Sequence, residues 1–556
     1  MTRFAVASLV IVVVAAAACG GDGAGPVPIP CLDGRGTPIT LAVGQYVTID
    51  PGTDSGCVQF AASAFVDTAE YVLVPQSAAG TFGLSSPFQL RGATTTTLAA
   101  AAALAPPGGL LPGQSPIAAA FDGVLRGIGR SRAYGVPMAP PAARAPSAIA
   151  PARVTPPSPG SLRSFKVCSN LTCSSFQTVA ARARGVSQHI AVYIDTLAPK
   201  PGLDSADVDT IMQVFDTLLY PLDTATFGGV SDIDTNGVAI VLMTGVVNKL
   251  VTKTQCTSSG YIAGFFFPGD LDPAFASQYN HGEIFYSIVA DSAAKLSCAH
   301  SASSVKHSTP ITFTHEFQHM INFVQHVLVR SANSEDGWLD EGLSKYAEEL
   351  AGRAYLAAGD SAEFSNYAIG DVYDGYQYLK ATGTSPLMIE FDDGTLAEVG
   401  ASWLFTRYLV DQYGDSLPHK LASSALAGAA NIAAQTGHAF DTTVTRWEVA
   451  NWVSDLQGFG FTAPPELTYT TWHFRKTFAS LHTQDATDFP LPYPLVPTLS
   501  AGGATNVSGV LRSGSGVFHR ALQAPGAPGF ALYFVRSGTT PLPANVVPRL
   551  SVIRVR

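Results

Sequence analysis

The stretch Thr309–His326, TPITFTHEFQHMINFVQH, places ionisable side chains inside a largely apolar run, and it restricts the fold more than any other segment. Ionisable groups are rarely buried unless a partner compensates them. HEFQH holds two histidines four residues apart, and such positions lie on one face of a helix, about 6 Å apart. His315 and His319 can therefore bind one ion, and zinc accepts imidazole ligands together with water. The segment predicts a helix that supplies half of a zinc site, with Glu316 beside the ion.

The third zinc ligand has to come from another segment. His326 is expected on the same helical face as His319, but seven residues at 1.5 Å each are about 10 Å along the axis. That distance is too long for His326 to share one ion with His315. The metzincin pattern is also excluded, because Asn322 and Gln325 stand where it requires Gly and His.

A second helix is predicted in Asp336–Leu350, DGWLDEGLSKYAEEL, where leucines and a tyrosine recur at helical spacing. Asp336 is a suitable N-cap, and Glu341 falls in the first turns. The short loop SANSED allows this helix to pack antiparallel to the first one. Such packing would bring Glu341 to the two histidines as the third zinc ligand.

Three more acidic residues of this second helix, Asp340, Glu348 and Glu349, are expected to be solvated helix charges. Glu348 shares a face with Glu341, so it is also placed to orient a ligand. Four histidines lack ligand spacing and are expected on the surface or in the core: His281, His300, His307 and His326.

The segment Asp232–Gly237, DIDTNG, resembles the first half of a calcium-binding loop. Its twelfth position is Met243, where a bidentate glutamate is expected, so an EF-hand is excluded. We therefore expect a tight turn stabilised by Asp and Asn side chains. Glu283, in the later segment NHGEIFYSI, is expected to be a surface residue or to support the site.

HExxH followed by a glutamate-bearing helix resembles the gluzincins, the metallopeptidase group that includes thermolysin and the aminopeptidase N relatives. WLDEGLSKYAEEL is similar to the WLNEGFAxYxE segment of those aminopeptidases. The nearer resemblance is to the hyicolysin-like bacterial metallopeptidases. It is carried by THEFQHMINF and WLDEGLS and supported by YPLDTATFGGVSDIDTNGVAIVLMTGVVN, GEIFYSI and SWLFTRYLVDQYG, and it covers roughly Phe165–Phe474.

This resemblance implies a zinc metallopeptidase, a hydrolase of proteins or peptides with one Zn²⁺ per chain. His315, His319 and Glu341 would be the zinc ligands, and Glu316 would take the proton of a zinc-activated water. The GxMEN segment of the aminopeptidases is missing from the sequence, which favours an endopeptidase. The oxyanion stabiliser stays open among six tyrosines: Tyr367, Tyr373, Tyr376, Tyr378, Tyr408 and Tyr413.

The predicted fold class is multidomain α+β, with a zincin-type catalytic domain at 162–478 flanked by small β-sandwich domains. In the catalytic domain we expect a β-rich N-terminal part with strands in SQHIAVYIDT, GVAIVLMTGVV and GEIFYSIVA, and a helical active-site part later. LDSADVDTIMQVFDTLLYPL predicts a helix capped by Asp204 and Ser205.

Outside the catalytic domain, short apolar runs alternate with turn residues at 37–133 and 492–556. This pattern predicts one small β-sandwich in each segment. The first segment ends in a short basic run, FDGVLRGIGRSRAYG, that is expected to be helical. The Pro/Ala-rich segment 134–161 reads as a semi-rigid linker.

The N-terminus has the features of an export signal. Residues 1–18 combine one arginine with a short apolar run, and AAAC resembles a bacterial lipobox that would leave Cys19 lipidated. Residues 19–36 would be a tether, and the lipid anchor would be the protein's contact with a membrane. Export to the bacterial cell envelope, or secretion, is therefore expected.

Six cysteines remain after Cys19, and an even number in an exported chain predicts three disulfides. Neighbours in the sequence are the simplest pairs: Cys31–Cys57, Cys168–Cys173 and Cys256–Cys298. Spacing of the CxxC type is missing, which argues against a cysteine-rich metal site.

Charge and composition exclude one class of function. The 556 residues are only 13% charged, with a formal net charge of -10 and no run of Lys and Arg. Nucleic-acid binding usually requires a basic patch, so nucleic acid is not an expected partner. The alternative to an enzyme is an inactive surface-anchored lipoprotein that uses the peptidase-like fold as a binding scaffold.

Overall fold

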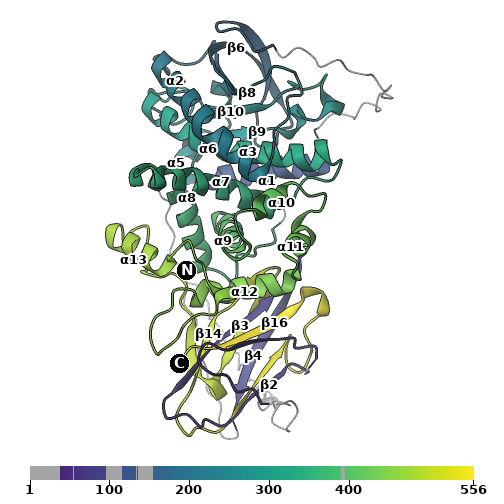
Figure 1. The fold of residues 1–556 in the computed structure, drawn as a ribbon, viewed down its shortest axis with the longest axis vertical. Coiled ribbons are helices and arrows are strands. Elements are labelled where there is room, and N and C mark those ends of the chain that lie inside the picture. Colours follow the sequence, from purple (N-terminus) through teal and green to yellow (C-terminus); the bar gives the residue numbers. More distant parts are fainter. Residues whose placement is uncertain (1–37, 54, 95–114, 133, 135–154, 390–394) are drawn as a thin grey trace, which may run out of the picture.

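The computed structural model describes residues 38–53, 55–94, 115–132, 134, 155–389 and 395–556. The predicted signal segment, Cys19 and the tether lie outside these residues, as does most of the predicted linker. The described residues form a mixed α+β structure with three sheets. Figure 1 shows three regions along the long axis: a mixed sheet with helices at one end, a helical layer in the middle and a β-sandwich at the other end.

The mixed sheet has the strand order β5-β6-β7-β8-β10-β9. Its three central strands β7, β8 and β10 run parallel, and the edge strand β9 pairs antiparallel with β10. The three strands predicted for the N-terminal part of the catalytic domain are confirmed as β7, β8 and β10. Nearly all of their side chains are buried, as expected for apolar strands covered on both faces of a sheet. The strands of this sheet are β5 Leu162–Cys168, β6 Phe176–Val186, β7 Ile190–Asp195, β8 Ala239–Met243, β9 Gly264–Phe266 and β10 Ile284–Ser287.

Helices cover this sheet and form the middle layer (Figure 1). The predicted cap at Asp204 is confirmed: its carboxylate accepts a bond from the Asp207 N–H at 2.9 Å. The helices are α1 Pro116–Ser131, α2 Ser205–Val214, α3 Tyr220–Phe227, α4 Gly245–Asn248, α5 Lys253–Ser259, α6 Ala302–Phe323, α7 Gly337–Ala357, α8 Ser361–Lys380, α9 Leu396–Tyr413, α10 Leu417–Ala422, α11 Gly428–Thr436, α12 Phe440–Val453 and α13 Phe474–Gln484. Within the described ranges, no helix combines the length and apolar character needed to cross a bilayer.

The β-sandwich is built from both ends of the chain. One sheet has the order β1-β16-β3-β14-β11, with β13 beside β3, and the other has the order β12-β4-β15-β2. The strands are β1 Tyr46–Ile49, β2 Cys57–Phe60, β3 Ala69–Ser77, β4 Ser85–Ala93, β11 Thr498–Ala501, β12 Asn506–Arg512, β13 Ser515–Gly516, β14 His519–Gln523, β15 Phe530–Val535 and β16 Pro548–Arg554.

The prediction of two separate sandwiches, one at 37–133 and one at 492–556, is wrong. Strand β3 pairs with β16, and β4 lies between β12 and β15, so N-terminal and C-terminal strands are interleaved in both sheets. Phe60 stacks on Phe530 with ring centroids 4.2 Å apart in the shared core. Alternating apolar residues reveal which side chains face inward but not which strand is the neighbour.

The predicted basic helix exists as α1, but it does not belong to the sandwich. Its buried residue Phe121 packs edge-on against Phe265 of β9 at 5.3 Å. Arg132, which follows α1, makes a bidentate ion pair with Asp272 at 2.8 and 2.7 Å. The helix is therefore fixed beside the edge strand of the mixed sheet.

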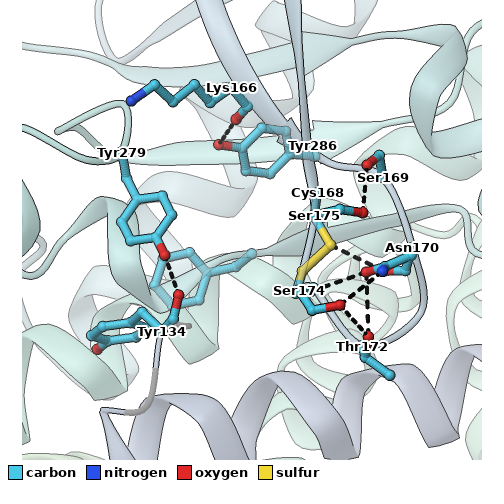
Figure 2. The surroundings of a disulfide bond; sticks show 12 residues. Tyr134, Lys166, Cys168, Ser169, Asn170, Thr172, Ser174, Ser175, Tyr279 and Tyr286 are labelled. Atoms are coloured by element: carbon cyan, nitrogen blue, oxygen red, sulfur yellow. Dashed lines mark hydrogen bonds between the residues drawn. A yellow bond between two sulfur atoms is a disulfide. The ribbon is translucent and has the colours of Figure 1, made fainter. Parts of the chain in front are cut away.

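Two of the three predicted disulfides are present, Cys168–Cys173 and Cys256–Cys298. Cys31 lies outside the described residues, so its pairing with Cys57 stays a prediction. Figure 2 shows the Cys168–Cys173 bond in the turn between β5 and β6, where Asn170 bonds to neighbouring hydroxyl groups. The same view shows the Tyr279 hydroxyl donating to the Tyr134 carbonyl, a contact that fastens the chain just after α1.

Candidate metal centre

The predicted ligand residues converge between α6 and α7. Nε2 of His315 lies 3.1 Å from Nε2 of His319, both on α6. The two carboxylate oxygens of Glu341 on α7 lie 3.5 Å from His315 Nε2 and 3.4 Å from His319 Nε2. All three side chains are buried. The structure therefore brings together the three residues that the sequence selected as ligands.

The second ring nitrogen of each histidine faces another carboxylate. His315 Nδ1 donates to Glu348 Oε1 at 2.7 Å, and His319 Nδ1 lies 3.0 Å from Asp340 Oδ2. A carboxylate at Nδ1 fixes that nitrogen as the protonated one, which leaves the Nε2 lone pair for a metal. The structure therefore turns Nε2 of His315 toward the centre of the cluster as an acceptor, and it places the Asp340 carboxylate beside Nδ1 of His319.

The expectation that Asp340, Glu348 and Glu349 are solvated is wrong. Asp340 and Glu348 are each 7% exposed, and Glu349 is fully buried. Packing of α6, α8 and α9 around α7 removes all three from water. Glu349 accepts bonds from the indole N–H groups of Trp403 and Trp472, so it anchors the core rather than the metal centre.

Electrostatics agree with a cation at the centre of this cluster. Burial opposes the charged form of His315, but bonds and charges from Glu341 and Glu348 outweigh it and raise its pKa well above 6.5. Burial disfavours ionised Glu341, yet the two histidines hold its pKa well below 4.5. In the metal-free protein, protons on the histidines therefore supply the positive charge that a bound cation would supply.

A zinc ion fits this donor set. With Nδ1 of each histidine beside a carboxylate, the two Nε2 atoms face each other 3.1 Å apart, and Glu341 Oε1 has no hydrogen-bond donor among the described residues. Three converging acceptors repel unless a cation lies between them. Two imidazoles and one carboxylate, with an open fourth position, are a set that catalytic zinc uses.

The predicted acid/base residue lies next to this cluster. Glu316 is 1% exposed, and its Oε2 accepts a bond from the Phe266 N–H of β9 at 3.0 Å. Arg126 of α1 lies 3.9 Å from the same oxygen and also donates to the Phe266 carbonyl at 3.2 Å. Helix α1 and the edge strand therefore hold the carboxylate in place.

Asp122 of α1 is a site residue that the sequence analysis missed. One of its carboxylate oxygens lies within 4.8 Å of ligand atoms of His315 and Glu316. Its Oδ1 is buried and has no hydrogen-bond partner among the described residues. Burial and the charges of Glu316 and Glu341 raise its pKa well above 3.8. No sequence signal could have found it, because it lies 193 positions before His315 in a run of small residues.

A cavity of about 430 Å³ opens onto these groups. Its walls come from α1, the segment before and into β9, and helices α6 to α9. Tyr367 is the one of the six candidate tyrosines that lines it, whereas the hydroxyls of Tyr376 and Tyr408 bond to distant main-chain carbonyls. Tyr261, which was not among the candidates, also lines the cavity.

Of the histidines set aside in the sequence analysis, His307 lines the cavity, whereas His326 and His300 have other surroundings. His326 is buried and lies 3.8 Å from Glu335, and it belongs to none of the potential metal-binding groups among the described residues. His300 lies beside the cysteines of the Cys256–Cys298 disulfide, which are already bonded to each other. Cys19 is outside the described residues.

Comparison of the chain with known protein families finds no match, and comparison with curated proteins finds none either.

Proposed function

We propose that the protein is a zinc-dependent metallopeptidase of the gluzincin type that hydrolyses internal peptide bonds of proteins or peptides. The observation that supports this most is the convergence of His315, His319 and Glu341 within 3.5 Å of one another. Glu316, buried beside them, supports hydrolysis rather than metal storage, because a storage site does not need an extra carboxylate at its open side.

The residues of the chain have separate roles in this proposal. The two histidines and Glu341 would hold a zinc ion, which would supply a Lewis acid for activating a water molecule and polarising the scissile carbonyl. Glu316 takes the proton of the attacking water and passes it to the leaving amine. The Phe266 N–H and Arg126 keep the Glu316 carboxylate pointed at the cavity. Tyr261 and Tyr367 both line the cavity, and the choice of oxyanion stabiliser stays open between them.

Asp122 favours a second candidate, an aminopeptidase. A buried carboxylate without a partner beside the reactive centre is suited to bind the free α-amine of a substrate. One peptide, prepared with a free N-terminus and with an acetylated N-terminus, distinguishes the two candidate activities. An endopeptidase cleaves both forms at the same internal bond, and an aminopeptidase removes residues only from the free form.

The test of the main proposal combines metal analysis with proteolysis. We expect one zinc per chain in the purified protein and cleavage of casein by the wild type. Glu316→Gln should keep the zinc but lose at least 100-fold in rate, the lower range for a general base. Asp209→Asn, an exposed aspartate of α2, is the matched control and should match the wild type. Absence of stoichiometric zinc, or equal cleavage by wild type and Glu316→Gln, would contradict the proposal. Zinc binding without any hydrolysis would favour the alternative, an inactive lipoprotein that uses the fold as a binding scaffold.

We also propose that the protein is exported and anchored at the cell envelope through a lipid on Cys19. Two disulfides among the described residues support an oxidising compartment. Cell fractionation of the wild type and of Cys19→Ala tests this. The wild type should be in the membrane fraction and the variant should be released, and equal membrane association of both would exclude the lipid anchor.

A further inference from the structure

A second cluster of carboxylates lies far along the chain from the zinc ligands, in the loop between α3 and β8. We propose that Asp232 and Asp234 of this loop, together with Glu283 directly before β10, bind a calcium ion. This inference is independent of the proposed peptidase function.

The three carboxylates come close enough to share one ion. One oxygen of each lies within 4.8 Å of the others. Calcium binds oxygen at 2.3–2.6 Å, so two ligands on opposite sides of it are about 5 Å apart. The group contains only oxygen donors, which calcium prefers and zinc does not require.

Glu283 distinguishes this cluster from an ordinary group of acidic side chains on the surface. Its side chain is 1% exposed, so the expectation of a surface residue is wrong. Its Oε1 accepts bonds from Ser231 Oγ at 2.5 Å and from the Ile233 N–H at 3.0 Å, so the carboxylate faces the loop. Its Oε2 is buried without a hydrogen-bond partner among the described residues. A buried acceptor of this kind is costly unless a cation or a proton compensates it.

The fold explains how a calcium-loop pattern without its final glutamate can bind an ion. Strand β8 begins two residues after the loop, and it pairs in parallel with β10, with Ile240 opposite Ile284. Glu283 therefore lies beside the start of β8, and a neighbouring strand supplies the glutamate that Met243 does not. Gly282 makes room for this approach, because a Cβ there would lie 3.0 Å from Asp234 Oδ2.

The charge balance also fits a divalent ion. Three ionised carboxylates carry a formal charge of −3, and Arg163, whose Nη1 lies 3.2 Å from Asp234 Oδ2, contributes +1. The net formal charge of these four groups is therefore −2, which one divalent cation balances. Arg163 also donates to the Asn280 carbonyl at 2.9 Å, so it is held at the edge of the cluster and compensates only one of the three carboxylates.

The experiment measures calcium binding to the full-length protein, as purified, after dialysis into calcium-free buffer. We expect calorimetric titration to show one Ca²⁺ per chain with a dissociation constant in the millimolar range or tighter. Thermal unfolding should shift upward saturably with Ca²⁺, because the ion binds the folded chain. Magnesium, which demands a tighter octahedral site, should give a smaller shift.

Asp232→Asn is the decisive variant. Asp232 is exposed, and an asparagine keeps the acceptor for the Gly237 N–H, which lies 3.0 Å from Oδ1, so the loop should remain folded. We expect Asp232→Asn to weaken calcium binding at least tenfold and Asp209→Asn to leave it unchanged. Glu283→Gln should weaken it too, and circular dichroism verifies its fold. No calcium binding at millimolar concentration, or equal binding by wild type and both site variants, would overturn the inference. Calcium binding by Glu316→Gln should equal that of the wild type, so failure of the peptidase proposal and failure of this one can be told apart.

Discussion

His315 Nδ1 lies 2.7 Å from Glu348 Oε1, and this contact decides which nitrogen of the imidazole faces the cavity. Lys345 lies 3.2 Å from the same carboxylate oxygen. Burial raises the pKa of Glu348, but Lys345 and His315 outweigh burial and lower it below 4.5. Glu348 is therefore an ionised partner that orients His315, and it would make His315 a stronger ligand of the proposed zinc ion.

Removal of Glu348 should weaken zinc binding without removing a zinc ligand. We expect Glu348→Ala to reduce zinc affinity about 10–100-fold, the usual cost of losing the partner of a ligating histidine. Glu348→Gln should reduce zinc affinity less than Glu348→Ala, because its amide oxygen can still accept the hydrogen bond from His315 Nδ1. Competition with a chromophoric chelator measures both, with Asp209→Asn as control. Wild-type affinity in Glu348→Ala would show that the contact has no role in metal binding.

Asp122 should destabilise the metal-free protein in a pH-dependent way. Its pKa is raised above 3.8 by burial and by the charges of Glu316 and Glu341. A carboxyl with a raised pKa contributes most to stability below its ordinary pKa, and this contribution is lost as pH rises through the raised value. Asp122→Asn should therefore stabilise the zinc-free protein more at pH 8 than at pH 4.

The zinc-loaded protein is the control for Asp122. A bound cation offsets the repulsion among the carboxylates, so the gain from Asp122→Asn should be smaller there. Thermal unfolding of wild type and variant, each with and without zinc at both pH values, gives the comparison. A gain that does not change with pH, or is larger in the zinc-loaded protein, would contradict the role assigned to this carboxylate.

Gly342, directly after the proposed zinc ligand Glu341, lies where α7 approaches α9 closely. A Cβ at this position would lie 2.6 Å from the Ser402 carbonyl oxygen and closer still to Thr406 Oγ1. Alanine normally stabilises a helix relative to glycine by about 0.5–1 kcal/mol. Here the helices would have to separate, and we expect Gly342→Ala to cost about 1–3 kcal/mol and to weaken zinc binding.

Gly370 provides the matched control for Gly342. It lies in helix α8, and a Cβ there would meet no atom within 4 Å. Gly370→Ala should be neutral or stabilising by up to about 1 kcal/mol. Chemical unfolding of both variants measures the difference. Equal effects of the two substitutions would mean that the approach of α7 to α9 does not constrain the metal centre.

The sequence predicted those features of the site that depend on short-range spacing. His315 and His319 share a helical turn, and Glu341 lies in the next helix, so local geometry was enough to bring them together. The burial of Asp340 and Glu348 could not be predicted, since it depends on helices that pack from elsewhere in the chain. Asp122 was missed for the same reason.

The β-sandwich also depends on contacts between distant segments that the sequence pattern could not predict. Gln76 of β3 donates to Ser551 of β16 at 2.8 Å across 475 positions of sequence. Alternation of apolar residues identified strands at both ends of the chain but carried no information about their partners. Segments far apart in the sequence therefore complete both the sandwich and the wall of the cavity.

Glu448 of α12 should make the stability of the protein fall as pH rises. It is fully buried, and burial raises its pKa to about 8 although the Tyr378 hydroxyl donates to it at 3.1 Å. Its ordinary pKa is 4.5. Its favourable contribution is therefore complete below pH 4.5 and is lost as pH rises from 4.5 through about 8. The loss is at most about 5 kcal/mol, at about 1.4 kcal/mol for each pH unit.

Glu448→Gln removes the charge and keeps an amide oxygen that can accept the Tyr378 hydrogen bond. The variant and the wild type should have similar stability near pH 5, and the variant should be more stable by a few kcal/mol at pH 8.5. Glu335, whose pKa burial also raises to about 8, titrates in the same window. The difference between variant and wild type at each pH is therefore the quantity to measure, by chemical unfolding of the zinc-loaded protein. Parallel pH profiles for the two proteins would mean that Glu448 is already compensated in the folded chain.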